Sequence, residues 1–318
     1  MKRLFVTLIT GANGFIGRNL CVFLKEKGYF VRGAVRNNVR DVSGIDEYIQ
    51  VGDINESTDW QQALVGVDTV IHLAARVHII KESVVDSLEA FRKVNVWGTE
   101  RLARMAAQAG VRRFVFISSI GINGEVTFER PFTENDIPCP VSAYAVSKWE
   151  AEQKLWQVSK DTGLEVVILR SPLVYGPGAP GNFGRLIHLI QFGLPIPLGD
   201  IKNSRSFIYL GNLVDAIVTC ITHPLAAGET FLVSDCADVS TPDLIKMIAC
   251  AMNKKPVLFS LHPSILKALC KIVGKDEELE KLTGTLLVDS SKIRNLLGWK
   301  APFTMEEGIR ETVKYYKS

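Results

Sequence analysis

The sequence predicts an α/β protein built on a doubly wound parallel sheet, with a smaller C-terminal α/β part. In the first half, short runs of β-branched residues alternate with helical stretches, which is typical of a parallel sheet covered by helices on both faces. A glycine-rich segment, 11–17, follows the first of these runs. Beyond Arg170 the regular alternation ends, and proline and glycine become frequent.

The expected elements follow one another in a regular order. Strands are expected at 4–9, 29–35, 47–51, 67–73, 113–118 and 164–169, and helices at 15–27, 85–109 and 142–162. Each helix is followed by a glycine, at Gly28, Gly110 or Gly163, and glycine commonly ends helices because it adopts the left-handed conformation without strain. Right-handed crossovers between these elements then give the doubly wound arrangement.

The loss of regular alternation and the rise in proline and glycine after Arg170 predict two domains. Residues 1–172, together with about 204–236, are expected to form the domain of the large sheet. Residues 173–203 and 237–318 are expected to form the smaller, substrate-binding domain.

Composition excludes several classes of protein. The 318 residues are 47% hydrophobic and carry a formal charge of only +3, with the basic residues scattered, so no nucleic-acid partner is expected. No stretch reaches the roughly 20 apolar residues of a membrane-spanning helix, so no membrane insertion is expected. The six cysteines form no CxxC pair, which favours free thiols in a reducing cytoplasm and no metal site.

The glycine-rich segment predicts a dinucleotide site at the first crossover. Its spacing, Gly-x-x-Gly-x-x-Gly between a strand and a helix, lets backbone N–H groups and the helix dipole approach a pyrophosphate, as in Rossmann folds. The residues expected to bind the cofactor there are Gly11, Asn13, Gly14, Phe15, Ile16 and Gly17.

The end of the second strand indicates which cofactor binds. An acidic residue at this place binds the ribose 2′-hydroxyl of NAD, whereas an arginine accommodates the 2′-phosphate of NADP. Here the strand ends in Val35-Arg36-Asn37, without a carboxylate. Arg32 and Arg40 are nearby. This favours NADP(H), with Arg36 as its ligand, over NAD(H).

Tyr144 and Lys148 are four residues apart on the predicted helix 142–162 and therefore share one face. A phenol beside a cation ionises more easily than its ordinary pKa of about 10 allows. Such a phenol can act as a general acid or base on a hydroxyl or carbonyl. The spacing alone is common, so its meaning depends on the rest of the chain.

Several motifs occur together in a characteristic order. They are Gly11-x-x-Gly14-x-x-Gly17, Asp53-Ile54, His72-Leu73-Ala74-Ala75, Asn95, Ser118-Ser119 and Tyr144-x-x-x-Lys148. Over essentially its whole length the chain resembles the extended short-chain dehydrogenases/reductases, in the group of nucleotide-sugar epimerases and dehydratases. The resemblance implies a cytoplasmic enzyme that transfers hydride between a sugar carbon and a nicotinamide.

The resemblance implies a role for each matching residue. Ser119, Tyr144 and Lys148 would be catalytic: Ser119 binds the oxygen at the reacting carbon, Tyr144 is the acid/base, and Lys148 binds the nicotinamide ribose and lowers the pKa of Tyr144. Further cofactor contacts would come from Asp53, Ile54, Leu73, Ala74, Ala75, Asn95, Ser118 and Ser171. His72 is interpreted as a packing residue of the cofactor channel rather than a catalytic one.

The substrate would be a UDP-sugar. By the same resemblance, Asn182 and Phe183 would contact its diphosphate and Arg205 would clamp it. Many members have a second arginine before the C-terminal Val-Asp-x-Ser-Lys stretch, and here Lys281 is the available substitute. Helices 85–109 and 142–162 resemble those that pair two subunits, so a homodimer is expected.

Two reactions remain open for such a site. Dehydratases of the group carry an acidic pair after the serine, but here Ser119 is followed by Ile120-Gly121, which disfavours dehydration. Arg36 favours a 4-reductase of a UDP-4-keto-6-deoxy-HexNAc, giving a UDP-N-acetylquinovosamine type of precursor for bacterial surface polysaccharide. The alternatives are a UDP-glucose or UDP-GlcNAc 4-epimerase with tightly bound NAD, and a non-catalytic NADP-binding sensor, which would not need Ser119, Tyr144 and Lys148 together.

Overall fold

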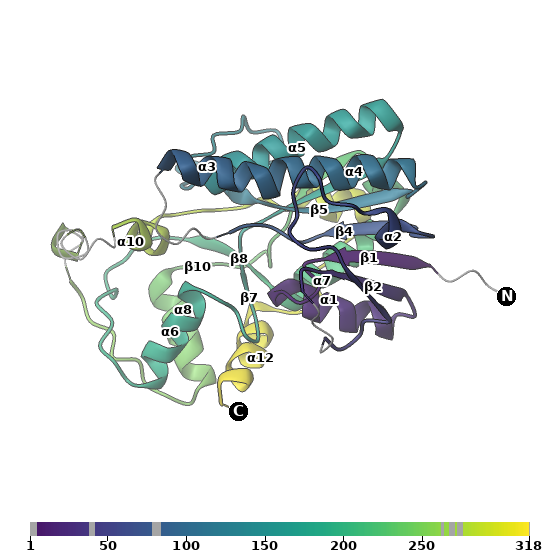
Figure 1. Ribbon diagram of the computed structural model, residues 1–318. Helices are drawn as coiled ribbons and strands as arrows, with labels where there is room; N and C mark the ends of the chain where they lie inside the picture. The colour runs from purple at the N-terminus through teal and green to yellow at the C-terminus, as the bar shows by residue number, and fades with distance from the viewer. Residues whose placement is uncertain are drawn as a thin grey trace.

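A computed structural model of the chain describes residues 5–37, 42–77, 84–261, 264–266, 271 and 276–317. Two sheets organise these residues, one of seven strands and one of three. Figure 1 shows that the large sheet and its helices form one end of the molecule, whereas α6, α8 and α10 lie at the other end.

The seven-stranded sheet is parallel throughout and confirms the predicted fold class. Its order is β3-β2-β1-β4-β5-β6-β9, so the strand order reverses between β1 and β4, which is where doubly wound proteins bind their ligands. The strands are β1 (Val6–Thr10), β2 (Phe30–Val35), β3 (Glu47–Gln50), β4 (Thr69–His72), β5 (Arg113–Ser119), β6 (Glu165–Ser171) and β9 (Glu229–Leu232).

Helices cover both faces of this sheet (Figure 1). The strands are apolar on both sides because successive side chains point to opposite faces: Leu8 belongs to one buried cluster and Ile9 to another. One face packs against α1 (Phe15–Glu26), α7 (Leu210–Thr222) and α11 (Ser291–Leu297). The other packs against α2 (Gln61–Leu64), α4 (Gly98–Gln108) and α5 (Ala143–Thr162).

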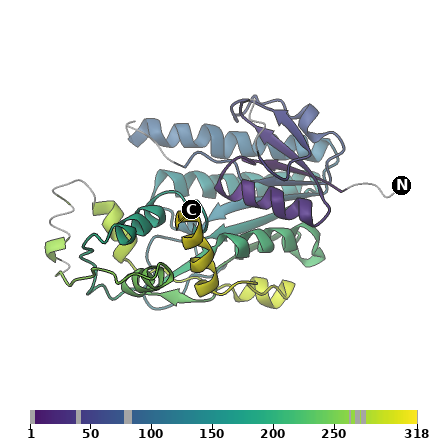
Figure 2. The ribbon, with the colours of Figure 1, turned by 90° about the horizontal axis from the view of Figure 1, so that it is seen from below.

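The smaller part has its own sheet and its own apolar core. Its strands, in the order β10-β8-β7, are β7 (Leu173–Tyr175), β8 (Arg205–Tyr209) and β10 (Asp238–Val239). Its helices are α6 (Asn182–Gln191), α8 (Thr241–Ala251), α10 (Asp276–Thr283) and α12 (Met305–Lys317). Seen from below in Figure 2, α12, which ends near the label C, lies towards the middle of the molecule.

Two details differ from the sequence prediction. The expected helix 85–109 is divided into α3 (Val84–Arg92), a π-helical turn Lys93–Trp97 and α4. Segment 204–236, expected to belong to the large-sheet domain, contributes to both sheets, because β8 joins the small sheet while β9 joins the large one. In the described part of the chain, helices combining the length and apolar character needed to span a bilayer do not occur.

Candidate active site

The glycine-rich turn between β1 and α1 is packed so closely that side chains would not fit. A Cβ on Gly17 would lie 2.2 Å from the carbonyl oxygen of Gly11. Gly11 itself has φ +66°, and a Cβ there would lie 2.9 Å from the backbone nitrogen of Ala74. The turn is closed by a hydrogen bond of 2.9 Å from the amide of Gly14 to the oxygen of Gly11.

This turn fits the pyrophosphate of a dinucleotide. Helix α1 begins at Phe15, directly after Gly14, which has no side chain to cover the first amides of the helix. Asn13 and Gly14 are exposed at this helix start, where the helix dipole favours an anion. Phe15 and Ile16 pack partly against the core, so their backbone rather than their side chains faces the turn.

Arg36 lies where the sequence places it, directly after β2. Its Nε is 3.1 Å from Oδ1 of Asp53, and both side chains are exposed. Arg32, in contrast, is buried and donates to Glu47 and to the carbonyl oxygens of Ala63 and Val65, so its guanidinium is bonded within the protein. Arg40 lies outside the described residues.

His72, at the end of β4, has the packing role expected from the sequence. Its Nδ1 is 2.6 Å from Oγ1 of Thr10, and its Nε2 is 2.9 Å from Oγ1 of Thr99. Burial, together with the charge of Lys148, lowers the pKa of His72 to about 3, so the imidazole is neutral. The amide of Ala74 donates to the same Thr10 oxygen at 3.1 Å, which fixes the 73–75 segment beside the glycine-rich turn.

Asn95 connects this segment to the helix of Tyr144. It lies in the π-helical turn and is 1% exposed. Its Oδ1 accepts from the amide of Arg76 at 2.9 Å, and its Nδ2 donates to the oxygen of Arg76 and to Oγ of Ser147, both at 3.0 Å. Ser147 donates in turn to the carbonyl oxygen of Tyr144 at 2.8 Å. Single-turn π-helices are frequent at functional sites.

Ser119 and Tyr144 lie at the carboxyl end of β5 and at the start of α5. Ser119 caps a short 3-10 turn (Ile120–Ile122), and its Oγ accepts from the amide of Gly121 at 3.1 Å. Ser142 caps α5, so Tyr144 lies in the first turn of that helix. The turn and the helix touch, because a Cβ on Gly121 would lie 3.3 Å from Ser119 Oγ and 3.4 Å from the Cβ of Ala145.

Lys148 is 2% exposed, and its Nζ lies 3.8 Å from the centre of the Phe116 ring. Burial lowers its pKa to about 7, although Glu152 acts in the opposite direction. The phenol of Tyr144, whose ring meets that of Phe91 edge-on at 6.0 Å, also differs from the expectation. Burial raises the pKa of Tyr144 to about 12.

The prediction that Lys148 lowers the pKa of Tyr144 is therefore wrong for the protein alone. Burial removes water from the phenolate, and the pKa of Tyr144 rises for this reason.

Two serines complete the predicted cofactor set. Ser118 is buried, and its Oγ makes no hydrogen bond within the described part of the chain. Ser171 pairs with Ser119 across β5 and β6. A buried hydroxyl without a partner is unusual, and a bound group is one way to satisfy it.

The predicted diphosphate ligands lie in the smaller part. Arg205 begins β8, and its Nη1 donates to the oxygen of Gly284 at 2.7 Å. Burial lowers its pKa. Asn182 is the first residue of α6, and Phe183 is buried and stacked on Tyr175 at 5.2 Å. Only the backbone of Phe183 is thus left to contact a ligand, and the side chain of Lys281 lies outside the described residues.

Sequence reasoning missed three buried polar residues next to this site, Asn123, Glu152 and Arg170. Glu152 follows Lys148 by one helical turn, so the shared face was a usable signal. Arg170 ends an apolar strand, where a charged residue requires a partner. Nothing local in the sequence indicated that Asn123 is buried.

A glycine-rich turn at the switch point of a parallel sheet, with a hydroxyl, a phenol and an amine beside it, defines a dinucleotide-dependent α/β oxidoreductase. The chain belongs to the NAD dependent epimerase/dehydratase family, whose family model matches residues 7–234. This agrees with the resemblance of its motifs to short-chain dehydrogenases/reductases.

Individual relatives match over nearly the whole chain. It is 43% identical over 312 residues to a UDP-glucose 4-epimerase of Vibrio cholerae, covering 97% of this chain and 94% of the relative. It is 28% identical to an N-acetyl-alpha-D-glucosaminyl-diphospho-ditrans,octacis-undecaprenol 4-epimerase of Escherichia coli O157:H7, covering 97% and 94%. The solved UDP-glucuronic acid 4-epimerase of Bacillus cereus, in complex with NAD, superposes with a TM-score of 0.80 at 25% identity, covering 98% and 99%.

Proposed function

We propose that the protein reduces C4 of a UDP-4-keto-6-deoxy-HexNAc with NADPH, giving a UDP-N-acetylquinovosamine type of sugar for bacterial surface polysaccharide. The observation that carries this proposal is Arg36 directly after β2, in a segment, 33–38, without the carboxylate that is typical of NAD-specific sites. Its ion pair with Asp53 is exposed, and exposed pairs contribute about 0–1 kcal/mol. The guanidinium can therefore turn to a 2′-phosphate at little cost.

The residues of the site have distinct tasks in this reaction. The glycine-rich turn holds the pyrophosphate, Arg36 the 2′-phosphate, and Lys148 the nicotinamide ribose. The bound nicotinamide supplies the hydride. Ser119 orients the keto oxygen at C4, and Tyr144 gives its phenolic proton to that oxygen. The raised pKa of Tyr144, about 12, keeps the phenol protonated and ready to donate.

The proposal excludes dehydration on the residues after Ser119. Ile120 is buried, and the amide of Gly121 is used by Ser119 Oγ. Neither residue has a side chain that carries a proton, whereas removing water from a sugar requires an additional acid/base group.

A 4-epimerase is the second candidate. It is favoured by the 43% identity to the Vibrio cholerae relative named UDP-glucose 4-epimerase, and by the NAD in the Bacillus cereus structure. An epimerase would retain its cofactor through the cycle, whereas a reductase must exchange it. The third alternative, a non-catalytic NADP sensor, predicts that Tyr144→Phe leaves the biological phenotype unchanged.

One set of assays separates these candidates. The purified protein is given UDP-4-keto-6-deoxy-GlcNAc with NADPH or NADH, and UDP-glucose with NAD. We expect oxidation of NADPH with the keto sugar, and an Arg36→Asp variant that binds NADPH about 10- to 100-fold more weakly, because a charged hydrogen bond contributes about 1.5–3 kcal/mol. Tightly held NAD with interconversion of UDP-glucose and UDP-galactose, and no NADPH turnover, would refute the reductase.

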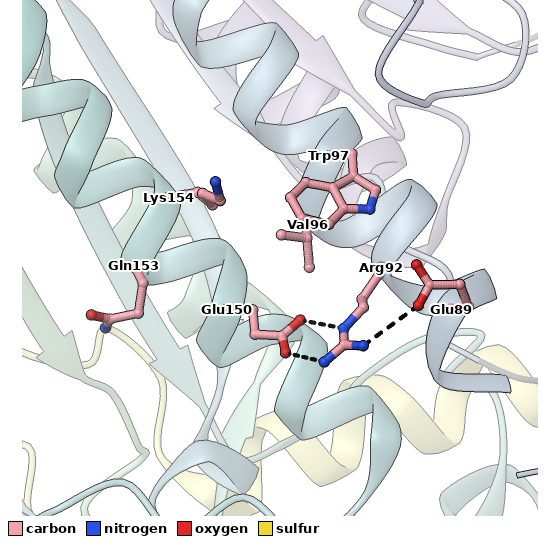
Figure 3. A pocket seen from close by; sticks show the side chains of 7 residues that line it. All are labelled: Glu89, Arg92, Val96, Trp97, Glu150, Gln153 and Lys154. Atoms are coloured by element: carbon pink, nitrogen blue, oxygen red, sulfur yellow. Dashed lines mark hydrogen bonds and ion pairs between the residues drawn. The ribbon is translucent and has the colours of Figure 1, made fainter. Parts of the chain in front are cut away.

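We also propose that the protein forms a homodimer through α3, α4 and α5. Figure 3 shows a hollow on this face, lined by residues that include Arg92, Trp97 and Glu150. Trp97 is 37% exposed, an unusual position for so large an apolar side chain. Arg92 and Glu150 join α3 to α5 by bonds of 2.8 and 2.6 Å, giving a rigid surface. A monomer in light scattering at micromolar concentration would contradict this proposal.

A further inference from the structure

A buried ion pair joins α5, the helix that carries Tyr144 and Lys148, to β6. Arg170, near the end of β6, donates from Nε and Nη2 to the carboxylate of Glu152 at 3.0 and 2.6 Å. Glu152 lies on α5, one turn beyond Lys148. The two side chains are 7% and 1% exposed, so this is an ion pair within the protein interior.

The third nitrogen of the same guanidinium bonds to the 3-10 turn that begins at Ser119. Arg170 Nη1 donates to Oδ1 of Asn123 at 2.9 Å. Asn123 ends the 3-10 turn that Ser119 begins; its amide donates to the oxygen of Ile120 at 2.9 Å, and its Nδ2 donates to the oxygen of Thr133 at 2.9 Å. The planar fork of one arginine thus bonds to the helix of Tyr144 and to the turn of Ser119.

We propose that Arg170 is a positioning residue for hydride transfer, holding the Ser119 turn and the Tyr144–Lys148 helix in register through Asn123 and Glu152. This inference rests on the proposed function, since it assumes that Ser119 and Tyr144 act on the same oxygen. A planar fork suits the task better than an ammonium would, because its donors have fixed relative directions. A displacement of about 1 Å between reacting groups can cost about 10²-fold in rate.

The pair also sets the charge near Lys148. Lys148 interacts electrostatically with Glu152 on its own helix and with His72 on β4, and Arg170 on β6 is bonded to that Glu152. His72 and Tyr144, which is one turn before Lys148, are neutral at pH 7. Glu152 raises the pKa of Lys148. Without that carboxylate, the unpaired Arg170 would oppose the charge of Lys148, so the pKa of Lys148 would fall.

The test uses four variants and one matched control variant, whose thermal stability is also measured. Glu152→Gln, Arg170→Met and their double variant change the pair. Asn123→Leu leaves the pair in place and removes its link to the Ser119 turn, together with the hydrogen bond from Asn123 to Thr133. Arg113→Met is the matched control: Arg113 is also buried on the sheet and bonds to Glu165 at 2.6 Å, but at the other end of β5. The readouts are kcat and KM for the keto sugar, and the pH titration of Lys148 by NMR of lysine-labelled protein.

We expect Asn123→Leu to lower kcat about 10²-fold with little change in KM and an unmoved Lys148 titration. Glu152→Gln lowers both kcat and the titration midpoint of Lys148. The double variant restores that midpoint towards the wild-type value, because both charges are removed. Arg113→Met loses thermal stability to a similar degree but keeps the kcat and the midpoint of the wild type.

A kcat that falls equally in Arg113→Met and Asn123→Leu, or a Lys148 midpoint unmoved by Glu152→Gln, would overturn the inference. The NMR titration is made on the protein without substrate. If the wild type fails to reduce any keto sugar, the proposed function fails, whereas the response of Lys148 to Glu152→Gln still tests the pair.

Discussion

Replacing Lys148 by methionine is expected to stabilise the protein while it abolishes activity. Lys148 is 2% exposed, and burial lowers its pKa from 10.5 to about 7. The folded state therefore disfavours the charged ammonium that the unfolded chain carries freely. Methionine has a similar length without the charge, so the variant avoids this cost.

The size of the effect follows from the pKa. A fall from 10.5 to about 7 corresponds to about 5 kcal/mol, at about 1.4 kcal/mol for each pKa unit. The contact of the ammonium with the Phe116 ring, at 3.8 Å, stabilises the charged form by about 2 kcal/mol in a desolvated site and offsets part of this cost. About 3 kcal/mol remains, which raises the Tm by about 6 °C in a chain of this size.

The sign of the pH dependence is fixed by the same shift. Because the folded pKa lies below the unfolded one, the unfolded chain binds more protons between about pH 7 and 10.5, and wild-type stability rises with pH across that window. The advantage of Lys148→Met is therefore largest below pH 7 and fades towards pH 10.5. Thermal unfolding at pH 6, 8 and 10 measures it.

Lys160→Met, on the exposed last turn of the same helix, serves as the control. It should change stability by less than about 1 kcal/mol without the pH trend. A Lys148→Met variant that is less stable than the wild type at pH 6, or equally shifted at all three pH values, would refute the reasoning.

Further predictions concern the glycine-rich turn, the proposed proton donor Tyr144, and Asn95. Gly17→Ala should lose most cofactor affinity in calorimetry, because its Cβ would lie 2.2 Å from a backbone oxygen. Gly28→Ala is the control: Gly28 follows α1, has φ +83° and has open space around it. This variant should lose about 1 kcal/mol of stability and bind cofactor normally. Tyr144→Phe should lower kcat by about 10²- to 10⁴-fold at nearly unchanged KM, and equal rates would exclude it as the proton donor. Asn95→Ala removes hydrogen bonds to the backbone of Arg76 and to Ser147 and should cost about 1–3 kcal/mol in chemical denaturation.

The features that the sequence predicted well are local ones. The glycine-rich turn is contiguous in the chain, and Tyr144 and Lys148 are one turn apart on a single helix. Both depend only on backbone geometry within a few residues. The parallel, doubly wound sheet followed from the alternation of strands and helices and from the handedness of the crossovers.

The features that escaped prediction depend on long-range packing. Arg170 meets Glu152 and Asn123, which precede it by 18 and 47 residues, only because β5 and β6 pair in the observed register. Phe183 matched a ligand position by its place in the sequence, but its side chain turns to the core and stacks on Tyr175. The direction of the Tyr144 pKa shift depends on how much water the folded site excludes, which sequence spacing does not reveal.

Two cationic side chains are buried against β5, and they differ in how well hydrogen bonds compensate for their burial. At its amino end, Arg113 is buried but makes five hydrogen bonds, to Glu165 and to three carbonyl oxygens. Lys148 on α5 is as deeply buried, but its ammonium faces the ring of Phe116 in the middle of this strand, and burial lowers its pKa. Selection for stability alone would give this lysine hydrogen-bond partners, as Arg113 has, or replace it by an apolar residue. Retaining a desolvated amine one turn after Tyr144 fits the proposed reaction, in which Lys148 holds the nicotinamide ribose, because functional sites retain groups that cost stability.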